Sequence, residues 1–295
     1  MVTKNKLALF DLEFYKKKLF IWRLVAIFTL IVLIFVTFKF DNINADKSDY
    51  IARVSINGFI DNDQFRIEKL DSIAKDKFAK ALIIDIDSPG GSVVGGELLF
   101  KKIKEISVSI PTVVFIGSQA TSAAYLAAIG ANYIVSPQGS LVGSVGVILQ
   151  SFDITEFAKS IGIEPIIIKS SVLKGVPHVA EKLTPEAKAS LEEVIDDIYI
   201  MFKDFVLESR TINDEYVAEA VSGRVFSGNK AFDMGLVDKV GDFQDVRDYL
   251  TNQNVSNKLK IKEITLKKDD VSSLFKIIAP VFDMFLNSLY TISAN

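Results

Sequence analysis

The chain has 295 residues, 49% of them hydrophobic, and a formal net charge of −3 at pH 7. It has no cysteine and one histidine, which excludes disulfides, thiol catalysis and zinc–thiolate sites and argues against a histidine-based metal site. A slightly acidic chain without a stripe of lysine and arginine also argues against a nucleic-acid-binding surface.

An apolar run near the N-terminus predicts a membrane anchor. Residues 19–38 are almost wholly apolar, with Arg23 as the only charged residue, and about 20 such residues cross a bilayer. Lysines precede the run and aspartates follow it, so the positive-inside rule predicts a cytoplasmic N-terminus. A cleaved signal peptide is the alternative, but it needs a shorter apolar run and a small-x-small site, which the residues up to Ala45 match poorly. The segments expected here are a cytoplasmic tail, a transmembrane anchor and a polar tether, over residues 1–18, 19–40 and 41–50.

The patterns that follow the tether predict an α/β fold. Strand-like runs cover residues 51–60, 81–86, 112–116, 133–135 and 145–149, and helix-like runs cover residues 64–80, 93–106 and 122–129. Strands that alternate with helices in this way imply βαβ units.

The pattern changes in the second half of this region. A strand is expected over residues 165–169, followed by a loop that carries Lys174. Thr184 and Pro185 then predict the start of a long amphipathic helix. The stripe of this helix expected to be buried comprises Leu191, Val194, Ile195, Ile198, Phe202, Phe205 and Val206. Beyond it we expect a helix, a turn, a short helix and a helix end that runs into an edge strand, over residues 214–221, 223–228, 229–234 and 235–241.

Ser122 is the candidate nucleophile, because it follows a buried strand and begins a short helix of small residues. A serine hydroxyl reacts only when a base removes its proton. A lysine serves as that base if burial among apolar groups lowers its pKa, and the apolar neighbours of Lys174 make it the candidate. The only histidine, His178, lies four residues later and is the competing base. Lys169 is a second competitor, although its place in a predicted strand favours an outward-facing side chain.

Five motifs occur in an order that resembles a known family. They are Ser-Pro-Gly-Gly-Ser92, Ala-Thr-Ser-Ala-Ala-Tyr125, Gly-Ser-Val-Gly-Val147, Ile-Lys-Ser-Ser-Val-Leu-Lys174, and Gly-Arg-Val-Phe-Ser-Gly228 followed by Gly-Leu-Val-Asp238. From about residue 50 to 250 the chain resembles the signal peptide peptidase A family, also called protease IV or the S49 serine peptidases. Short members of that family have a single repeat and one N-terminal anchor, which is the layout expected here.

The resemblance implies a role for each site residue. Ser122 would be the nucleophile, Lys174 the general base, and Ser144 the serine that orients the lysine. The backbone amides of Gly91 and Ala123 would stabilise the oxyanion. The implied fold is a crotonase/Clp-protease-like α/β domain over residues 51–250, and no metal or cofactor is implied.

The function implied is that of a membrane-anchored serine endopeptidase that hydrolyses remnant signal peptides and other apolar peptides. The resemblance places it in the bacterial inner membrane with a single span and an extracytoplasmic catalytic domain. Its expected partners are peptide substrates, membrane lipid and further copies of the chain in a ring. Two alternatives remain: a crotonase-fold enzyme that handles acyl-CoA, and an inactive membrane scaffold of the same fold.

Two regions depart from the family pattern. The family has Ser-Gly-Gly-Tyr-Tyr at the nucleophile, where this chain has Ser122-Ala-Ala-Tyr-Leu126, so two methyl groups enter near the site. Near the base, a family-like Ser-Gly is replaced by Ser170-Ser171. The C-terminal extension, residues 251–295, resembles the family least and contains an apolar segment at 271–292. That segment predicts a helix on the membrane surface or against another subunit, with a second span as the alternative.

Overall fold

The computed structural model describes residues 16, 18–20, 22–23, 26–30 and 48–266. The chain divides into two compact units, Met1–Ser48 and Asp49–Asn295. Among the residues described, no helix is long and apolar enough to cross a membrane. The greater part of the predicted anchor at 19–40 and the whole apolar segment at 271–292 lie outside the described residues.

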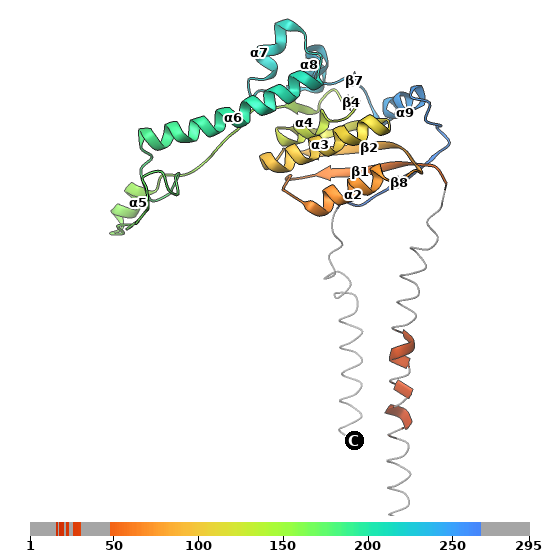
Figure 1. Ribbon diagram of the computed structural model, residues 1–295, viewed down its shortest axis with the longest axis horizontal. Coiled ribbons are helices and arrows are strands. Elements are labelled where there is room, and N and C mark those ends of the chain that lie inside the picture. The colour runs from red at the N-terminus through yellow and green to blue at the C-terminus, as the bar shows by residue number, and fades with distance from the viewer. Residues whose placement is uncertain (1–15, 17, 21, 24–25, 31–47, 267–295) are drawn as a thin grey trace, which may run out of the picture. The chain divides into compact units, whose positions relative to one another are not determined.

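A mixed, mostly parallel sheet of eight strands forms the centre of the second unit (Figure 1). Its strands are β1 Tyr50–Asn57, β2 Ala79–Ser88, β3 Thr112–Thr121, β4 Tyr133–Ser136, β5 Leu141–Gly143, β6 Val225–Ser227, β7 Lys239–Val240 and β8 Lys260–Glu263. The strand order is β6-β5-β3-β2-β1-β8, and only β5 and β6 pair antiparallel. The first half of β3 pairs with β4 and its second half with β5, so the sheet divides along this strand. The α/β expectation is therefore confirmed.

Helices cover both faces of the sheet. They are α2 Gln64–Ala74, α3 Val93–Ser109, α4 Ala123–Ala128, α5 Thr155–Ser160, α6 Pro185–Ser209, the 3₁₀ helix η1 Asp214–Tyr216, α7 Val217–Ala220, α8 Gly228–Met234 and α9 Phe243–Asn252. Apolar residues of α2, α3, α4 and the end of α6 share one core with Leu82, Ile84 and Ile86 of β2. Ile83 of the same strand faces a second core, which α9 covers. Because β2 is buried on both faces, it appears in the sequence as a continuous apolar run.

Four expectations about these elements were wrong. The helix expected over residues 64–80 ends at Ala74, because the chain turns at Asp76, whose carboxylate accepts a hydrogen bond from the Phe78 N–H. The strand expected at 145–149 is absent, because the strand β5 ends at Gly143, where the backbone takes a left-handed conformation. Residues 165–169 form no strand. The turn expected at 223–228 contains the short strand β6.

The start of α6 is confirmed: the Thr184 side chain accepts a hydrogen bond from the Ala187 N–H, and Pro185 is the first helical residue. Its predicted stripe is buried only in the second half of the helix. Phe202 and Val206 are buried in the core, whereas Val194 is 51% exposed. The first half extends, with α5, away from the sheet in Figure 1. Among its apolar residues Ala187 is buried, but Leu191 and Ile195 are only half-buried.

We call residues 148–184 the arm. It runs from the sheet to the start of α6 and contains α5, which lies in Figure 1 at the end of α6 remote from α4. Many of its apolar side chains are exposed: Ile148, Phe152, Phe157, Ile161, Ile163, Ile166, Ile168, Val172 and Leu173. An exposed apolar surface of this extent marks an interaction site in a folded protein.

Candidate active site

Three neighbouring strands end at the same place. β2 and β3 are parallel with Ser88 opposite Ala120, and β3 and β5 are parallel with Thr121 opposite Gly143. The residues that follow them, the Pro-Gly-Gly loop, Ser122 and Ser144, are therefore brought side by side. The carboxyl ends of parallel strands are where α/β proteins bind their ligands.

Ser122 has a backbone conformation that is rare for a residue with a side chain. Its φ is 55° and its ψ is −126°, between the end of β3 and the start of α4. Its N–H donates to the Gly143 carbonyl at 2.8 Å, and its carbonyl accepts from the Leu126 N–H at 3.0 Å. A conformation of this kind costs about 1–3 kcal/mol and persists where the surrounding structure imposes it, often at functional sites. The sharp turn places the Ser122 hydroxyl at the carboxyl end of β3.

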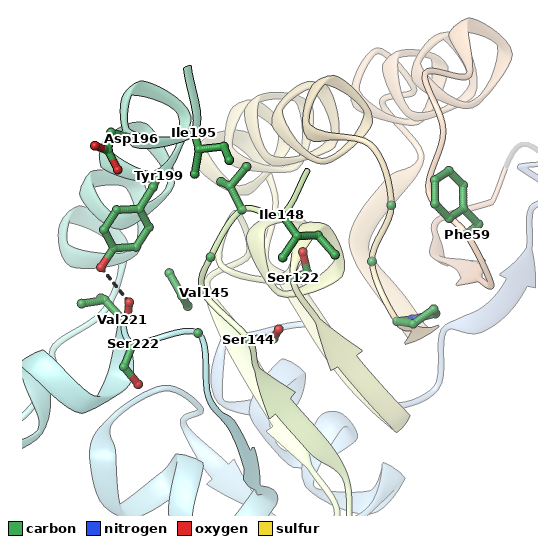
Figure 2. A pocket seen from close by; sticks show the side chains of 16 residues that line it. Phe59, Ser122, Ser144, Val145, Ile148, Ile195, Asp196, Tyr199, Val221 and Ser222 are labelled. Carbon is green, nitrogen blue, oxygen red and sulfur yellow. Dashed lines mark hydrogen bonds between the residues drawn. The ribbon is translucent and has the colours of Figure 1, made fainter. Parts of the chain in front are cut away.

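Ser144 is held in the same way on the adjacent strand. Its φ is also 55°, and its N–H donates to the Arg224 carbonyl at 2.7 Å. Gly143 before it has a φ of 99°, and a Cβ there would lie 3.1 Å from the Phe226 ring. Figure 2 shows the Ser122 and Ser144 side chains at the ends of neighbouring strands. The structure thus brings together two of the three residues predicted to do the chemistry.

The Pro89–Gly90–Gly91 turn packs directly against the nucleophile. A Cβ at Gly90 would lie 2.8 Å from the Ser122 Cβ, and a Cβ at Gly91 would lie 1.9 Å from the Ile60 carbonyl oxygen. The turn is bridged to Ile60 through the Gly90 carbonyl and the Ser92 N–H, and the Gly91 N–H takes no part in this bridge. Ala123 is the first residue of α4, and the first amide of a helix has no acceptor within the helix. Both predicted oxyanion donors are therefore placed beside Ser122.

The alanine after the nucleophile is accommodated by a glycine on another helix. A Cβ at Gly96 of α3 would lie 2.8 Å from the Ala123 Cβ. The helices α3 and α4 can therefore approach closely, with the Ala123 methyl group between them. Ala123 is 4% exposed and Ala124 is fully buried, so the Ala124 methyl group belongs to the core.

A cavity of about 680 Å³ opens in front of Ser122 (Figure 2). One wall comes from α6, whose Tyr199 hydroxyl donates to the Val221 carbonyl at 2.7 Å. The lining is otherwise mostly apolar or glycine: Phe59, Pro89, Gly90, Gly91, Ser122, Ser144, Val145, Gly146, Val147, Ile148, Ile195, Asp196, Tyr199, Val221, Ser222 and Gly223. Asp196 is the one charged side chain among these described lining residues. Such a cavity suits an apolar peptide better than a charged ligand.

The α6 wall and the segment after Ser144 were not predicted as parts of the site. The apolar residues of α6 indicated a helix packed in the core, but Ile195 and Tyr199 face the cavity. Residues 145–148 line it as irregular chain instead of forming a strand. The Gly-Ser-Val-Gly motif was the only signal for them.

Neither candidate base lies in this cavity. Lys174 is exposed on the arm, and its N–H donates to the Ser171 carbonyl at 3.2 Å. His178 is exposed on the same segment, and its Nδ1 accepts from the Ala180 N–H at 3.2 Å. Lys169 forms a close ion pair with Glu181, so its side chain is bound within the arm instead of facing outward. Within the described part of the chain, Ser122 and Lys174 are not brought together.

A buried polar network supports the helix that begins at Ser122. The Tyr125 hydroxyl donates to the Leu236 carbonyl at 2.8 Å, and burial raises the pKa of this phenol above its ordinary value. Arg210 at the end of α6 donates to both carboxylate oxygens of Asp238, at 2.8 and 2.9 Å. These bonds tie α4, α6 and the segment before β7 together behind the site. Among the described residues, no group of three or more His, Asp or Glu side chains could hold a metal ion.

Comparison with known proteins identifies the family. Residues 104–256 match peptidase family S49. A putative protease of Synechocystis sp. is 32% identical over 201 residues, which are 68% of this chain and 72% of the relative. A putative protease of Methanocaldococcus jannaschii is 33% identical over 195 residues, which are 66% of this chain and 63% of the relative. The chain belongs to peptidase family S49 and is a serine peptidase.

Two further comparisons have lower coverage or identity. The chloroplastic serine protease SPPA of Arabidopsis thaliana is 32% identical over 176 residues, which are 59% of this chain and 26% of that protein. The solved structure of the 1510-N membrane-bound stomatin-specific protease has a TM-score of 0.46 at 18% sequence identity, covering 78% of this chain and 98% of that one.

Proposed function

We propose that the chain is a membrane-anchored serine endopeptidase of crotonase/Clp-like fold that cleaves remnant signal peptides and other apolar peptides through a serine–lysine dyad. The observation that carries this is the placement of Ser122. It combines a left-handed backbone conformation, two adjacent amides for an oxyanion and a mostly apolar cavity in front of the hydroxyl. Acyl transfer needs an accessible nucleophile and donors for the oxyanion, and the cavity gives an apolar peptide a place beside both.

The chemical steps follow from this arrangement. The Ser122 oxygen attacks the peptide carbonyl carbon while its proton passes to the neutral lysine amine. The Gly91 and Ala123 amides stabilise the oxyanion, each worth about 10²–10³ in rate. The C–N bond then breaks, and the lysine returns the proton to the departing amine. Water next attacks the carbonyl carbon of the acyl-enzyme and gives a proton to the lysine. The bond between that carbon and the Ser122 oxygen then breaks, the lysine returns the proton to this oxygen, and the acid product leaves.

The position of Lys174 supports an active site shared between copies of the chain. Among the described residues the lysine is exposed, on an arm that exposes many apolar side chains. A lysine serves as a base where burial disfavours its charged form, and a second copy seated on the arm would supply that burial. We infer that the arm of one copy delivers Lys174 to the Ser122 and Ser144 pair of its neighbour. This accounts for the ring-like assembly that the family resemblance implies.

Mixing two inactive variants tests the function and the shared site together. Ser122→Ala and Lys174→Ala should each lack peptide hydrolysis, because each removes one half of every site. Co-assembled, the intact Ser122 of one variant meets the intact Lys174 of the other, and a substantial part of the activity should return. Failure of the mixture to recover activity, with mixed assemblies verified by differently tagged copies, would overturn the shared site. Loss of fluorophosphonate labelling in Ser122→Ala alone reports the nucleophile independently.

The membrane placement rests on the sequence, with lysines before the apolar run at 19–38 and aspartates after it. We propose a single span with the peptidase unit outside the cytoplasm, close to peptides released from the membrane. A C-terminal reporter should be active only outside the cytoplasm; a reporter active only inside would contradict the topology. A thioester assay run beside a fluorescent-peptide assay separates the peptidase from an acyl-CoA-handling enzyme, and labelling of Ser122 separates it from an inactive scaffold.

A further inference from the structure

Ser88 is a buried hydroxyl for which the proposed chemistry has no use. It is the last residue of β2 and is fully buried. Its Oγ donates to the Gly58 carbonyl at 2.5 Å and accepts from the Gly90 N–H at 3.1 Å. One side chain therefore joins the end of β1 to the turn that packs on Ser122.

These bonds determine the direction of the neighbouring amides. The Gly90 N–H is occupied by Ser88, and the Gly90 carbonyl accepts from the Ile60 N–H at 2.9 Å. In a trans peptide the carbonyl and the next N–H point in opposite directions. The Gly91 N–H therefore points away from Ile60 and is left for a ligand.

The turn cannot hold this orientation through its own residues. Gly90 has a φ of +107°, and glycine rotates more freely than any other residue. Its conformation must therefore be imposed by packing against Thr121 and Ser122 and by hydrogen bonds to the turn. The Ser88 hydroxyl supplies the bond on one side of Gly90, and the Ile60 amide supplies the bond on the other.

We propose that Ser88 is a positioning residue for the oxyanion site, whose hydroxyl holds the Pro89–Gly91 turn so that the Gly91 N–H faces the substrate carbonyl. This rests on the proposed function, in which Gly91 is an oxyanion donor. The effect belongs to the transition state, because the amide meets a full negative charge only there.

Ser140 offers a matched control. It is 3% exposed, and its Oγ donates to the Gly117 carbonyl at 2.5 Å, as Ser88 does to Gly58. Ser140 makes no contact with the Pro89–Gly91 turn among the hydrogen bonds of the described residues. Ser140→Ala therefore removes an equally buried serine hydroxyl without releasing the Gly90 amide.

The test compares Ser88→Ala and Ser140→Ala in the full-length protein. We expect Ser88→Ala to lower kcat about 10- to 100-fold, at most the loss of one oxyanion donor, with KM changed less than about twofold. Binding of a peptide boronic acid, which mimics the tetrahedral intermediate, should weaken in parallel, while binding of the product peptide should not.

Ser140→Ala should lower the melting temperature but leave kcat and boronate binding near the wild type. Ser88→Cys keeps a side chain of similar shape that forms weaker hydrogen bonds, and it should show the same pattern as Ser88→Ala. If Ser88→Ala does not fold, Ser88→Cys takes its place in the test.

Three outcomes would overturn the proposal. Ser88→Ala could keep its kcat, it could lose product and boronate binding equally, or Ser140→Ala could show the same loss of kcat. If the wild type hydrolyses peptides and reacts with a fluorophosphonate at Ser122, each of these outcomes rejects only the role of Ser88 and leaves the proposed function in place. A folded wild type that does neither rejects the proposed function and this proposal with it.

Discussion

At the scale of single residues, the site depends on backbone conformations that side chains normally avoid. Ser122 and Ser144 both have a φ of 55°. Hydrogen bonds from their N–H groups to Gly143 and Arg224 impose these conformations from neighbouring segments. The packing of the sheet compensates for the free-energy cost of the strain. The strained turns place both hydroxyls just beyond the carboxyl ends of β3 and β5.

The strain at Ser122 should therefore be measurable as a difference in stability between two variants of this residue. Ser122→Gly and Ser122→Ala should both be inactive, but the glycine variant should be more stable than the alanine variant by about 1 kcal/mol or more, because glycine adopts positive φ without a steric cost. Thermal unfolding of the two variants measures this difference. At Ser107 inside α3 the order should reverse, with glycine less stable than alanine by about 1 kcal/mol. Equal stability of the two Ser122 variants would contradict the strained conformation.

The identity of the base is decided by pH dependence. If Lys174 is the base, it must be neutral to act, so kcat/KM should rise with pH and level off well above the range in which an ordinary histidine titrates, about 6.5. Lys174→Arg should be inactive, because a guanidinium stays protonated at every usable pH. His178→Ala should keep most of its activity on the same peptide. An active Lys174→Arg together with an inactive His178→Ala would assign the role to the histidine.

At the scale of elements, the helix behind the nucleophile is held by a buried ion pair. Arg210 is 8% exposed at its side chain and donates to both oxygens of Asp238. Asp238 also accepts from the Ile134 N–H at 2.8 Å, which joins the end of α6 to β4. Removal of Arg210 takes away two charge-assisted hydrogen bonds to Asp238, whose side chain is 26% exposed, and a third to the Gly235 carbonyl, which is costly.

Two arginine variants compare the contribution of this ion pair to stability with that of a more exposed pair. Arg210→Gln should lower the free energy of unfolding by about 1.5–3 kcal/mol. Arg224→Gln removes a more exposed pair with Glu219 and should cost less than about 1 kcal/mol. Urea denaturation followed by circular dichroism measures both. Similar small losses in the two variants would show that the Arg210 pair contributes little.

At the scale of the whole molecule, the arm is an apolar surface that the described residues leave uncovered. Ile166 is 88% exposed and Ile168 is 94% exposed, on a segment that also carries the proposed base. Burial of such side chains by another copy stabilises an assembly by about 1.5–3 kcal/mol for each large residue. Assembly and catalysis should therefore be lost together when this surface is altered.

Ile168→Asp tests this link against a matched exposed position. The variant should shift the protein in detergent to smaller species and lower its peptidase activity by at least tenfold, because the charge would be buried at the contact. Val108→Asp, on α3 and 82% exposed, should change neither quantity. Light scattering after gel filtration measures the mass. An Ile168→Asp variant with unchanged mass and activity would exclude the arm as the contact.

Much of the fold followed from the sequence, because periodicity and turn residues are local properties. The apolar runs of β2 and β3, the helix start at Thr184 and the alternation of strands and helices were predicted and confirmed. Ser122, Ser144 and the amides of Gly91 and Ala123 could be named as site residues from motifs, and the structure places these four together. Their roles in catalysis stay predictions.

Other features were decided by tertiary contacts. The end of β5 at Gly143, the irregular chain at 145–148 and the exposed first half of α6 depend on which neighbours each segment meets, and apolar periodicity carries no information about neighbours. For the same reason the exposure of the arm could not be predicted. An apolar run such as 165–169 predicts burial, but only the fold shows that no strand of the described chain covers it. The role proposed for Ser88 likewise arises from its distances to Gly58 and Gly90, which belong to segments that come together only on folding.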